Sequence, residues 1–162
     1  MERAFQDYAP ERFSHCFGCG RNNQHGLHLK SYWDGNGGDT IARYTPRDYF
    51  TGGYPAHIFG GMIAALFDCH GIATAMAETY KREGRAMDDA LEPIRYVTAS
   101  LSVEYKNPTP IGMELVLYGK VSAVEGRKAF VDLVLRAEGI LCATGQMVAA
   151  RLPEDVMNAP GH

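Results

Sequence analysis

The fold of this chain is decided by residues 59–80, which read FGGMIAALFDCHGIATAMAETY. Alanine, methionine, leucine and isoleucine dominate this stretch, and all of them are compatible with an α-helix. No polar stripe appears before Glu78, and a helix that is apolar all round is buried on most of its sides. Lys81, Arg82 and then Gly84 follow, as is typical of a helix C-terminus. We therefore expect one long buried helix over about residues 59–80.

Strands are expected on both sides of this helix. Residues 97–106 alternate apolar and polar side chains, which indicates a strand with one covered face and one wetter face. Tight turns at 125–126 and 138–139 predict hairpins. The expected strands are 26–33, 39–44, 97–106, 113–124, 127–138 and 140–151. Together these elements predict an α+β fold, with a long central helix wrapped by a curved antiparallel sheet of about six strands.

The size and composition of the chain fit one globular domain. It has 162 residues, of which 46% are hydrophobic and 22% are charged. We expect an irregular lead-in over 1–24, a single domain over 25–152 and a flexible tail over 153–162. The net charge of -3 gives no field that would favour nucleic acid or an anionic membrane.

The apolar stretch Met62–Ala77 is broken by Asp68 and His70, and it is shorter than the ~20 residues that span a bilayer. The first residues contain no apolar run of the kind found in a signal peptide. Four cysteines without an export signal suit a reducing compartment. We therefore expect a cytoplasmic protein with no membrane partner.

Two glycines open the predicted helix. Without side chains, Gly60 and Gly61 leave backbone N–H groups accessible to a ligand oxygen, and the helix dipole adds positive potential. This arrangement stabilises the oxyanion that forms when an acyl carbonyl is attacked. Close packing of the helix against a sheet is an equally good explanation for a pair of glycines.

Asp68 lies two turns into the same apolar helix. Burying an unpaired carboxylate costs several kcal/mol, so its presence favours a role as a general base over a purely structural bond to a neighbouring strand. About 12 Å of helix separates Gly60 from Asp68 at ~1.5 Å per residue. In a symmetric dimer, the glycines of one subunit can instead face the aspartate of the other.

Gly60-Gly61 followed by an apolar helix with Asp68 resembles the hotdog-fold acyl-CoA thioesterases of the phenylacetate-degradation type. Residues 96–112, YVTASLSVEYKNPTPIG, are similar to the strand and proline turn that follow the helix in that family. CFGCG at 16–20 and DCHG at 68–71 resemble motifs of one bacterial branch. The likeness covers residues 16–151 and implies a hotdog fold.

The resemblance implies hydrolysis of an acyl-CoA, or of a related carrier thioester. In that reading Asp68 is the general base or nucleophile, the N–H of Gly60, with or without that of Gly61, polarises the thioester carbonyl, and Thr98 positions the attacking water. The expected partners are the thioester and further copies of the chain, as a dimer at minimum with a tetramer possible. No cofactor is expected, apart from coenzyme A as part of the substrate.

Two positions depart from the family pattern. Phe59, which we expect to contact the substrate, stands where many members have histidine, and His57 is a candidate replacement. Gly53 stands where some members have asparagine. These departures favour a second hypothesis, a non-catalytic binder of acyl-CoA or another small molecule. A third hypothesis pairs His57 with Asp68 in a hotdog dehydratase acting on hydroxyacyl thioesters.

Cations are needed for the phosphates of coenzyme A. Arg127 and Lys128, after the turn at 125–126, are the best placed pair, and Lys106 is a further candidate. A solvated hairpin tip is the plainer explanation for the first two.

Cys16 and Cys19, with His15 and His25 nearby, form a weak zinc-like pattern, but one CxxC alone favours a tight structural turn and no metal. Cys69 is expected to be a small core residue. His70 lies about 200° around the helix from Asp68, so the two cannot form a dyad within one chain. A core histidine with satisfied hydrogen bonds is favoured over an active-site role through a partner subunit.

Overall fold

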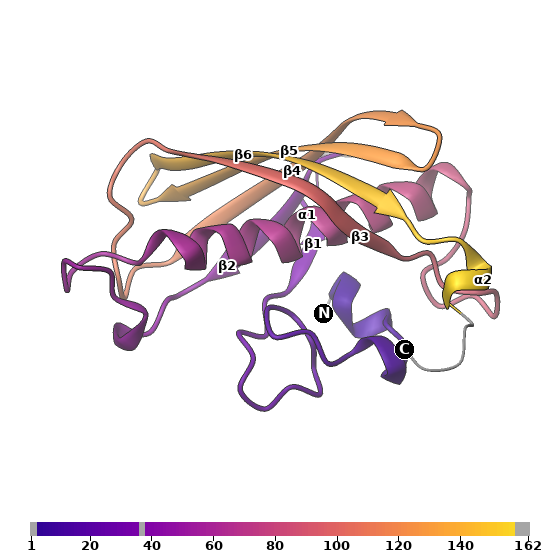
Figure 1. The fold of residues 1–162 in the computed structure, drawn as a ribbon, viewed down its shortest axis with the longest axis horizontal. Coiled ribbons are helices and arrows are strands. Elements are labelled where there is room, and N and C mark those ends of the chain that lie inside the picture. The colour runs from indigo at the N-terminus through magenta and orange to yellow at the C-terminus, as the bar shows by residue number, and fades with distance from the viewer. Residues whose placement is uncertain (1–2, 36–37, 158–162) are drawn as a thin grey trace.

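The computed structural model describes residues 3–35 and 38–157, and it places one long helix beneath an antiparallel sheet (Figure 1). Helix α1 spans Gly60–Arg82. The strands are β1 Ser31–Trp33, β2 Thr40–Tyr44, β3 Tyr96–Tyr105, β4 Leu115–Glu125, β5 Lys128–Ala137 and β6 Ile140–Arg151. All pairs are antiparallel in the order β1-β2-β4-β5-β6-β3, so β1 and β3 are the edges. The predicted α+β arrangement is confirmed.

Short helical turns lie outside this frame. The lead-in contains two 3₁₀ turns, Phe5–Tyr8 and Glu11–Phe13, and a third, Asp48–Phe50, precedes α1. A short helix, α2, spans Glu154–Met157 after the last strand. The lead-in packs on the side of α1 that faces away from the sheet, so the helix lies between two layers (Figure 1).

Helix α1 is the centre of the core because its apolar side chains meet both layers. Leu66, Phe67 and Ala75 are fully buried. The helix ends as predicted, with cations in its last turn and Gly84 at φ +62. The full helix is longer than the apolar stretch suggested, and by length and composition alone it could cross a bilayer. However, 67% of its most apolar window is buried inside the protein, as in the core helix of a folded domain.

The hairpins after the helix form where the sequence predicts them. Gly126 has φ +57 between β4 and β5, and Gly139 has φ +80 between β5 and β6, values that favour glycine in two-residue hairpin turns. The first strand is shorter than predicted, covering 31–33 rather than 26–33. The residues before it pair with the cysteine turn, because Leu27 and Leu29 donate backbone hydrogen bonds to Phe17 O and Gly18 O.

Strand β3 departs from the expected pattern of one covered and one wetter face. Tyr96 at its start is buried and Leu101 and Val103 pack partly against the core, but most of its other residues are exposed. The reason is its position, because β3 is an edge strand that pairs with β6 alone among the described strands. Its two ends nevertheless reach α1, and they define the candidate site described below.

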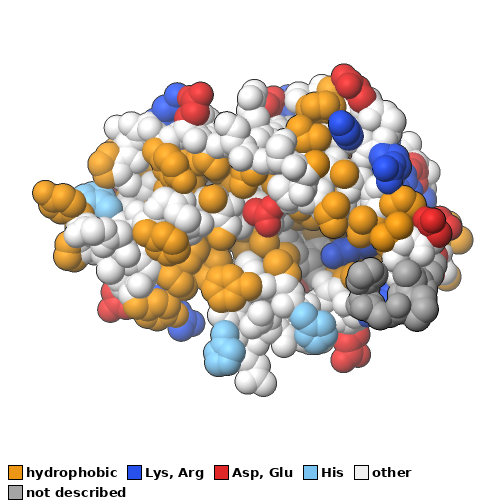
Figure 2. Space-filling view, in the orientation of Figure 1, with side chains coloured by type: hydrophobic (Ala, Val, Ile, Leu, Met, Phe, Trp, Pro, Cys, Tyr) orange, Lys and Arg blue, Asp and Glu red, His pale blue; other side chains and the backbone are white. Residues whose placement is uncertain are grey.

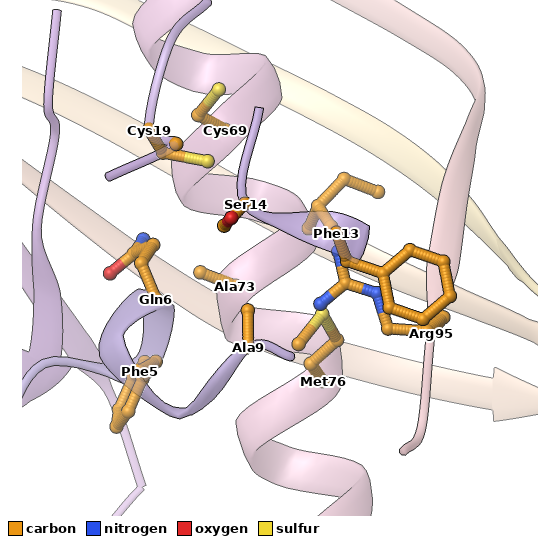
Figure 3. Close-up of a pocket in the computed structure, with 12 residues that line it drawn as sticks. Phe5, Gln6, Ala9, Phe13, Ser14, Cys19, Cys69, Ala73, Met76 and Arg95 are labelled. Atoms are coloured by element: carbon orange, nitrogen blue, oxygen red, sulfur yellow. The ribbon is translucent and has the colours of Figure 1, made fainter. Parts of the chain in front are cut away.

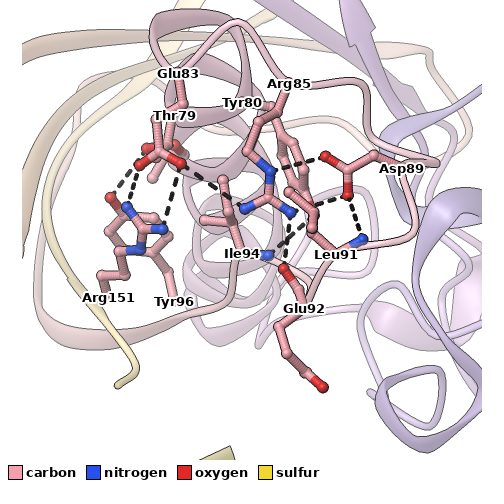
Figure 4. A network of polar contacts seen from close by, with 11 residues as sticks. Thr79, Tyr80, Glu83, Arg85, Asp89, Leu91, Glu92, Ile94, Tyr96 and Arg151 are labelled. Atoms are coloured by element: carbon pink, nitrogen blue, oxygen red, sulfur yellow. Dashed lines mark hydrogen bonds and ion pairs between the residues drawn. The ribbon is translucent and has the colours of Figure 1, made fainter. Parts of the chain in front are cut away.

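Polar contacts fix the connection between α1 and β3 (Figure 4). Arg85 forms two hydrogen bonds of 2.8 and 3.0 Å with Asp89, and the hydroxyl of Tyr80 accepts the Ile94 N–H at 2.9 Å. These bonds hold the start of β3 in place relative to the helix.

His70 is the core histidine that the sequence favours. Its Nδ1 lies 2.9 Å from Ser31 Oγ and its Nε2 lies 3.3 Å from Thr40 Oγ1, and the residue is fully buried. Burial lowers the pKa of His70 to about 4, so the ring is neutral near pH 7. Thr40 also bonds Thr74 at 2.6 Å, which completes a buried polar cluster between α1 and the first strands.

This cluster leaves no room for a side chain at Gly119 on β4. A Cβ there would lie 2.5 Å from Thr74 Oγ1 and 2.9 Å from Thr40 Oγ1. Gly119→Ala should therefore lower the free energy of unfolding by about 1–3 kcal/mol, as overpacked cores do. Urea denaturation checks this, with Gly53→Ala as the matched control because nothing lies within 4 Å of its added methyl. Equal stability of the two variants would contradict this packing.

Candidate active site

Asp68 and Thr98 meet at the edge of the sheet. The Thr98 hydroxyl donates a hydrogen bond to Asp68 Oδ1, joining the third turn of α1 to the beginning of β3. Asp68 is only partly buried and Thr98 is exposed, so the carboxylate is not enclosed in the core of its own chain. It is held by one neutral donor and is open to a further ligand on the flank of the helix.

A β-bulge aims Thr98 at the helix. The pairing of β3 with β6 shifts register between Thr98 and Ser100, which leaves Ala99 as the extra residue. Beyond the bulge, Leu101 and Val103 face the core. In an unbroken strand an even-numbered residue would face the opposite side from these two. The bulge reverses that alternation, so Thr98 shares the helix-facing side with them.

At the other end of β3, Tyr105 holds the start of α1. Its hydroxyl donates a hydrogen bond of 3.0 Å to Gly60 O. A Cβ on Gly60 would lie 3.1 Å from the Tyr105 ring, and one on Gly61 would lie 2.5 Å from the Phe59 ring. Both contacts are to partly exposed side chains, so a methyl group at either glycine would require only a small movement of Tyr105 or Phe59. Phe59 precedes the helix with extended backbone at φ -73 and ψ 145 and gives no side-chain cap.

Gly60 and Gly61 border an open groove at the start of the helix. Its lining residues are His57, Ile58, Gly60, Gly61, Ile63, Tyr105, Lys106, Asn107, Pro108 and Thr109. Within residues 3–35 and 38–157, neither Gly60 N–H nor Gly61 N–H has an acceptor among the backbone contacts. Thr109 is 3% exposed, and its Oγ1 has no hydrogen-bond partner among the described residues. Free donors at a helix N-terminus suit an anionic or carbonyl oxygen.

The predicted site residues thus fall into two groups within one chain. We call Asp68 and Thr98 the carboxylate end of β3, and Gly60, Gly61 and Tyr105 the amide end. His57 and Lys106 line the groove at the amide end, and Phe59 flanks it with 43% of its surface exposed. Lys106 forms an ion pair with Glu104. The two ends are separated by two turns of helix, about 12 Å.

Arg127 and Lys128 lie closer to the carboxylate end. Lys128 pairs with Ala150 on β6, while Thr98 pairs with the adjacent Ala149. Two strand spacings of ~4.8 Å therefore separate the strands that carry Lys128 and Thr98. Arg127 Nη1 also contacts Arg151 O at 3.4 Å.

Apolar side chains are gathered over the N-terminal part of α1 and the adjoining edge strand, with few charges among them (Figure 2). Val97 is 46% exposed and Tyr105 is 56% exposed. A sheet edge with this composition is suited to contact with another protein surface.

A single long helix under a six-stranded antiparallel sheet, with open amides at its first turn and a carboxylate two turns on, defines a hotdog-fold protein. Residues 56–143 match the family described as the thioesterase superfamily. The chain belongs to this superfamily.

Relatives agree with this assignment. A thioesterase superfamily protein from Shewanella loihica PV-4 is 37% identical, with a TM-score of 0.63, over 88% of this chain and 97% of that one. Acyl-coenzyme A thioesterase THEM4 from Xenopus laevis is 31% identical over 97 residues, which are 60% of this chain but 37% of that protein. The E. coli PaaI protein of the phenylacetic acid degradation operon, 12% identical with a TM-score of 0.57 over 71% of this chain and 73% of that one, shares the fold.

Sequence reasoning missed three features of the site. The hydroxyl of Tyr105 gave no signal, because its partner is a backbone oxygen 45 residues away in the chain. No sign of the bulge at Ala99 is present in the sequence, because apolar and polar residues alternate regularly on both sides of it. Cys69, expected to be a plain core residue, lies beside the cysteines of the lead-in.

Proposed function

We propose that this protein hydrolyses acyl-CoA thioesters at a site formed by two subunits, with Asp68 as the general base. The observation that carries the proposal is the hydrogen bond from Thr98 to Asp68 at an unpaired sheet edge. Membership of the thioesterase superfamily supports the reaction, and the similarity to acyl-coenzyme A thioesterase THEM4 supports coenzyme A as the carrier.

The chemistry needs one base, one water and one anion-binding site. Thr98 occupies one carboxylate oxygen of Asp68, which leaves the other to take a proton from water. The resulting oxygen nucleophile attacks the thioester carbonyl, and the oxyanion is stabilised by backbone amides at a helix start. The carbon–sulfur bond then breaks, and the proton goes to the leaving thiolate to give the free thiol and the carboxylic acid.

A dimer brings the two ends of β3 together. Antiparallel pairing of β3 with its copy, about a two-fold axis near Leu101 and Ser102, sets Thr98 opposite the partner subunit's Tyr105. Because Tyr105 bonds Gly60 within each chain, the partner subunit's Gly60 then faces Asp68. The same pairing covers the exposed edge of β3, which a protein normally protects.

Cations are available for the phosphates of coenzyme A on both sides of this composite site. Lys106 belongs to the amide end of one subunit, and Arg127 lies at the β4–β5 turn, two strands from the carboxylate end of the other; Lys128 begins β5 on the outer face of the sheet. Charge-assisted hydrogen bonds from these side chains would hold the phosphates outside the apolar acyl site.

Asp68→Asn should reduce kcat by about 10²- to 10⁴-fold, because it removes the base while keeping the shape of the side chain. A panel of acyl-CoA substrates with a thiol reagent measures the rate, and the melting temperature reports on folding. Tight binding of acyl-CoA by the unaltered protein without turnover would favour the non-catalytic binder instead.

Thr98→Val should reduce kcat by roughly 10- to 100-fold, the equivalent of one hydrogen bond to a charged group. Thr98→Ser keeps the hydroxyl and is the matched control, expected to stay within a few-fold of the unaltered enzyme. Because Thr98 is exposed, neither change should disturb the core. Equal rates for the valine and serine variants would show that the Thr98 hydroxyl does not take part in catalysis.

The shared site is testable by complementation between two inactive variants. Gly60→Pro removes the amide donor at the first helical position. Proline is tolerated at this position, and the extended backbone of the preceding Phe59 is already compatible with it. Heterodimers of Gly60→Pro with Asp68→Asn, isolated with two affinity tags, contain one intact site and should recover about half of the unaltered activity.

Gly60→Ala is the control for the added carbon atoms, because it keeps the N–H group. Heterodimers without recovered activity, or a chain that is monomeric by light scattering while fully active, would rule out a site shared between subunits.

A further inference from the structure

The cysteine motif of the lead-in forms a tight turn, as the sequence predicts. Gly20 N–H donates to Cys16 O at 2.8 Å, and a Cβ on Gly20 would lie 2.5 Å from Cys16 N. The backbone amides of Gly18 and Cys19 are among the groups that lower the pKa of the Cys16 thiol. Amides directed at a sulfur stabilise it in the negatively charged thiolate form.

A third cysteine completes this turn. The Sγ atoms of Cys16, Cys19 and Cys69 all lie within 4.8 Å of one another, and those of Cys16 and Cys69 are 3.6 Å apart. A Cβ on Gly18 would overlap Cys69 Sγ, so the turn is pressed directly against the helix. Figure 3 shows Cys19, from the lead-in, beside Cys69 on α1 at one end of the pocket.

We propose that Cys16, Cys19 and Cys69 bind one thiophilic d¹⁰ metal ion, Zn²⁺ with solvent as its fourth ligand or Cu⁺ in a trigonal site. Zinc binds cysteine sulfur at ~2.3 Å, so the sulfurs around one ion lie about 3.8 Å apart. The Cys16–Cys69 sulfur distance of 3.6 Å is close to this value, and all three sulfurs lie within 4.8 Å of one another. The CxxC with His15 and His25 gave only a weak zinc-like pattern, because the third cysteine, Cys69, lies 53 positions from Cys16 in the chain.

The surroundings fit a site of this charge. Three thiolates on Zn²⁺ carry a net charge of -1, and Arg95, which interacts electrostatically with both Cys16 and Cys19, provides a nearby cation. Cys16 is exposed, which gives an ion a route of entry.

A disulfide bond is a less suitable explanation for three adjacent sulfurs than a metal ion. Any one bridge joins two cysteines and leaves the third thiol beside it, whereas a metal ion engages all three. An ion also ties the lead-in to α1 one residue after Asp68, so its role would be to fix the layer that covers the helix.

Elemental analysis of the full chain, purified under reducing conditions with zinc and copper in the growth medium, tests this site without relying on catalysis. We expect about one metal ion per chain, and the metal found separates Zn²⁺ from Cu⁺. Cys16→Ser changes an exposed position and should lower the affinity at least roughly 10- to 100-fold. Cys142→Ser is the matched control and should retain the ion.

Reconstitution with Co²⁺ provides a second measurement. Thiolate-to-cobalt charge-transfer absorption should appear in the unaltered chain and in Cys142→Ser and should be lost in Cys16→Ser. A reduced, folded chain that takes up none of the three metals would overturn the proposal. So would equal metal content in the unaltered chain and Cys16→Ser, since the ion would then be held elsewhere.

Discussion

The structure depends on the burial of α1 between two layers. The sheet covers one side of the helix, and Phe5 of the lead-in packs with Ala73 and Ala77 on another. The flank along β3 is left less covered, because β3 is the last strand of the sheet. Asp68 occupies this flank, where a carboxylate can remain hydrated and can still be held by a hydroxyl. The position of the candidate site therefore follows from which sides of the helix are already occupied.

Local signals were sufficient to predict the helix and most strands. The apolar run, the cations of the last turn and Gly84 define α1, and two glycines with positive φ define the later hairpins. These features depend on residues that are neighbours in the chain. The predicted start of the first strand was wrong because residues before Ser31 do not pair with another strand. Leu27 and Leu29 instead donate backbone hydrogen bonds to the cysteine turn.

The candidate site was predictable in its residues but not in its geometry. Read as a regular strand, residues 97–106 would place Thr98 on the face opposite Leu101 and Val103, away from the helix. The bulge at Ala99 resolves this conflict, but its cause lies in the pairing with β6. Strict alternation therefore predicted the presence of β3 correctly, but it gave the wrong direction for the side chains that precede the bulge, Val97 and Thr98.

Asp68, Cys69 and His70 illustrate why consecutive residues of a motif need not act together. Successive side chains on a helix point about 100° apart, so three adjacent residues address three different surroundings. Asp68 faces β3, Cys69 faces the lead-in and His70 faces the buried hydroxyls of Ser31 and Thr40. Each side chain meets a chemically suitable group in its neighbour. The carboxylate of Asp68 meets a hydroxyl, the thiol of Cys69 meets two sulfurs, and the imidazole of His70 meets neutral hydrogen-bonding groups. These three residues therefore join one turn of α1 to three different neighbours. Of the three, only Asp68 lies where a substrate could approach it from the sheet edge.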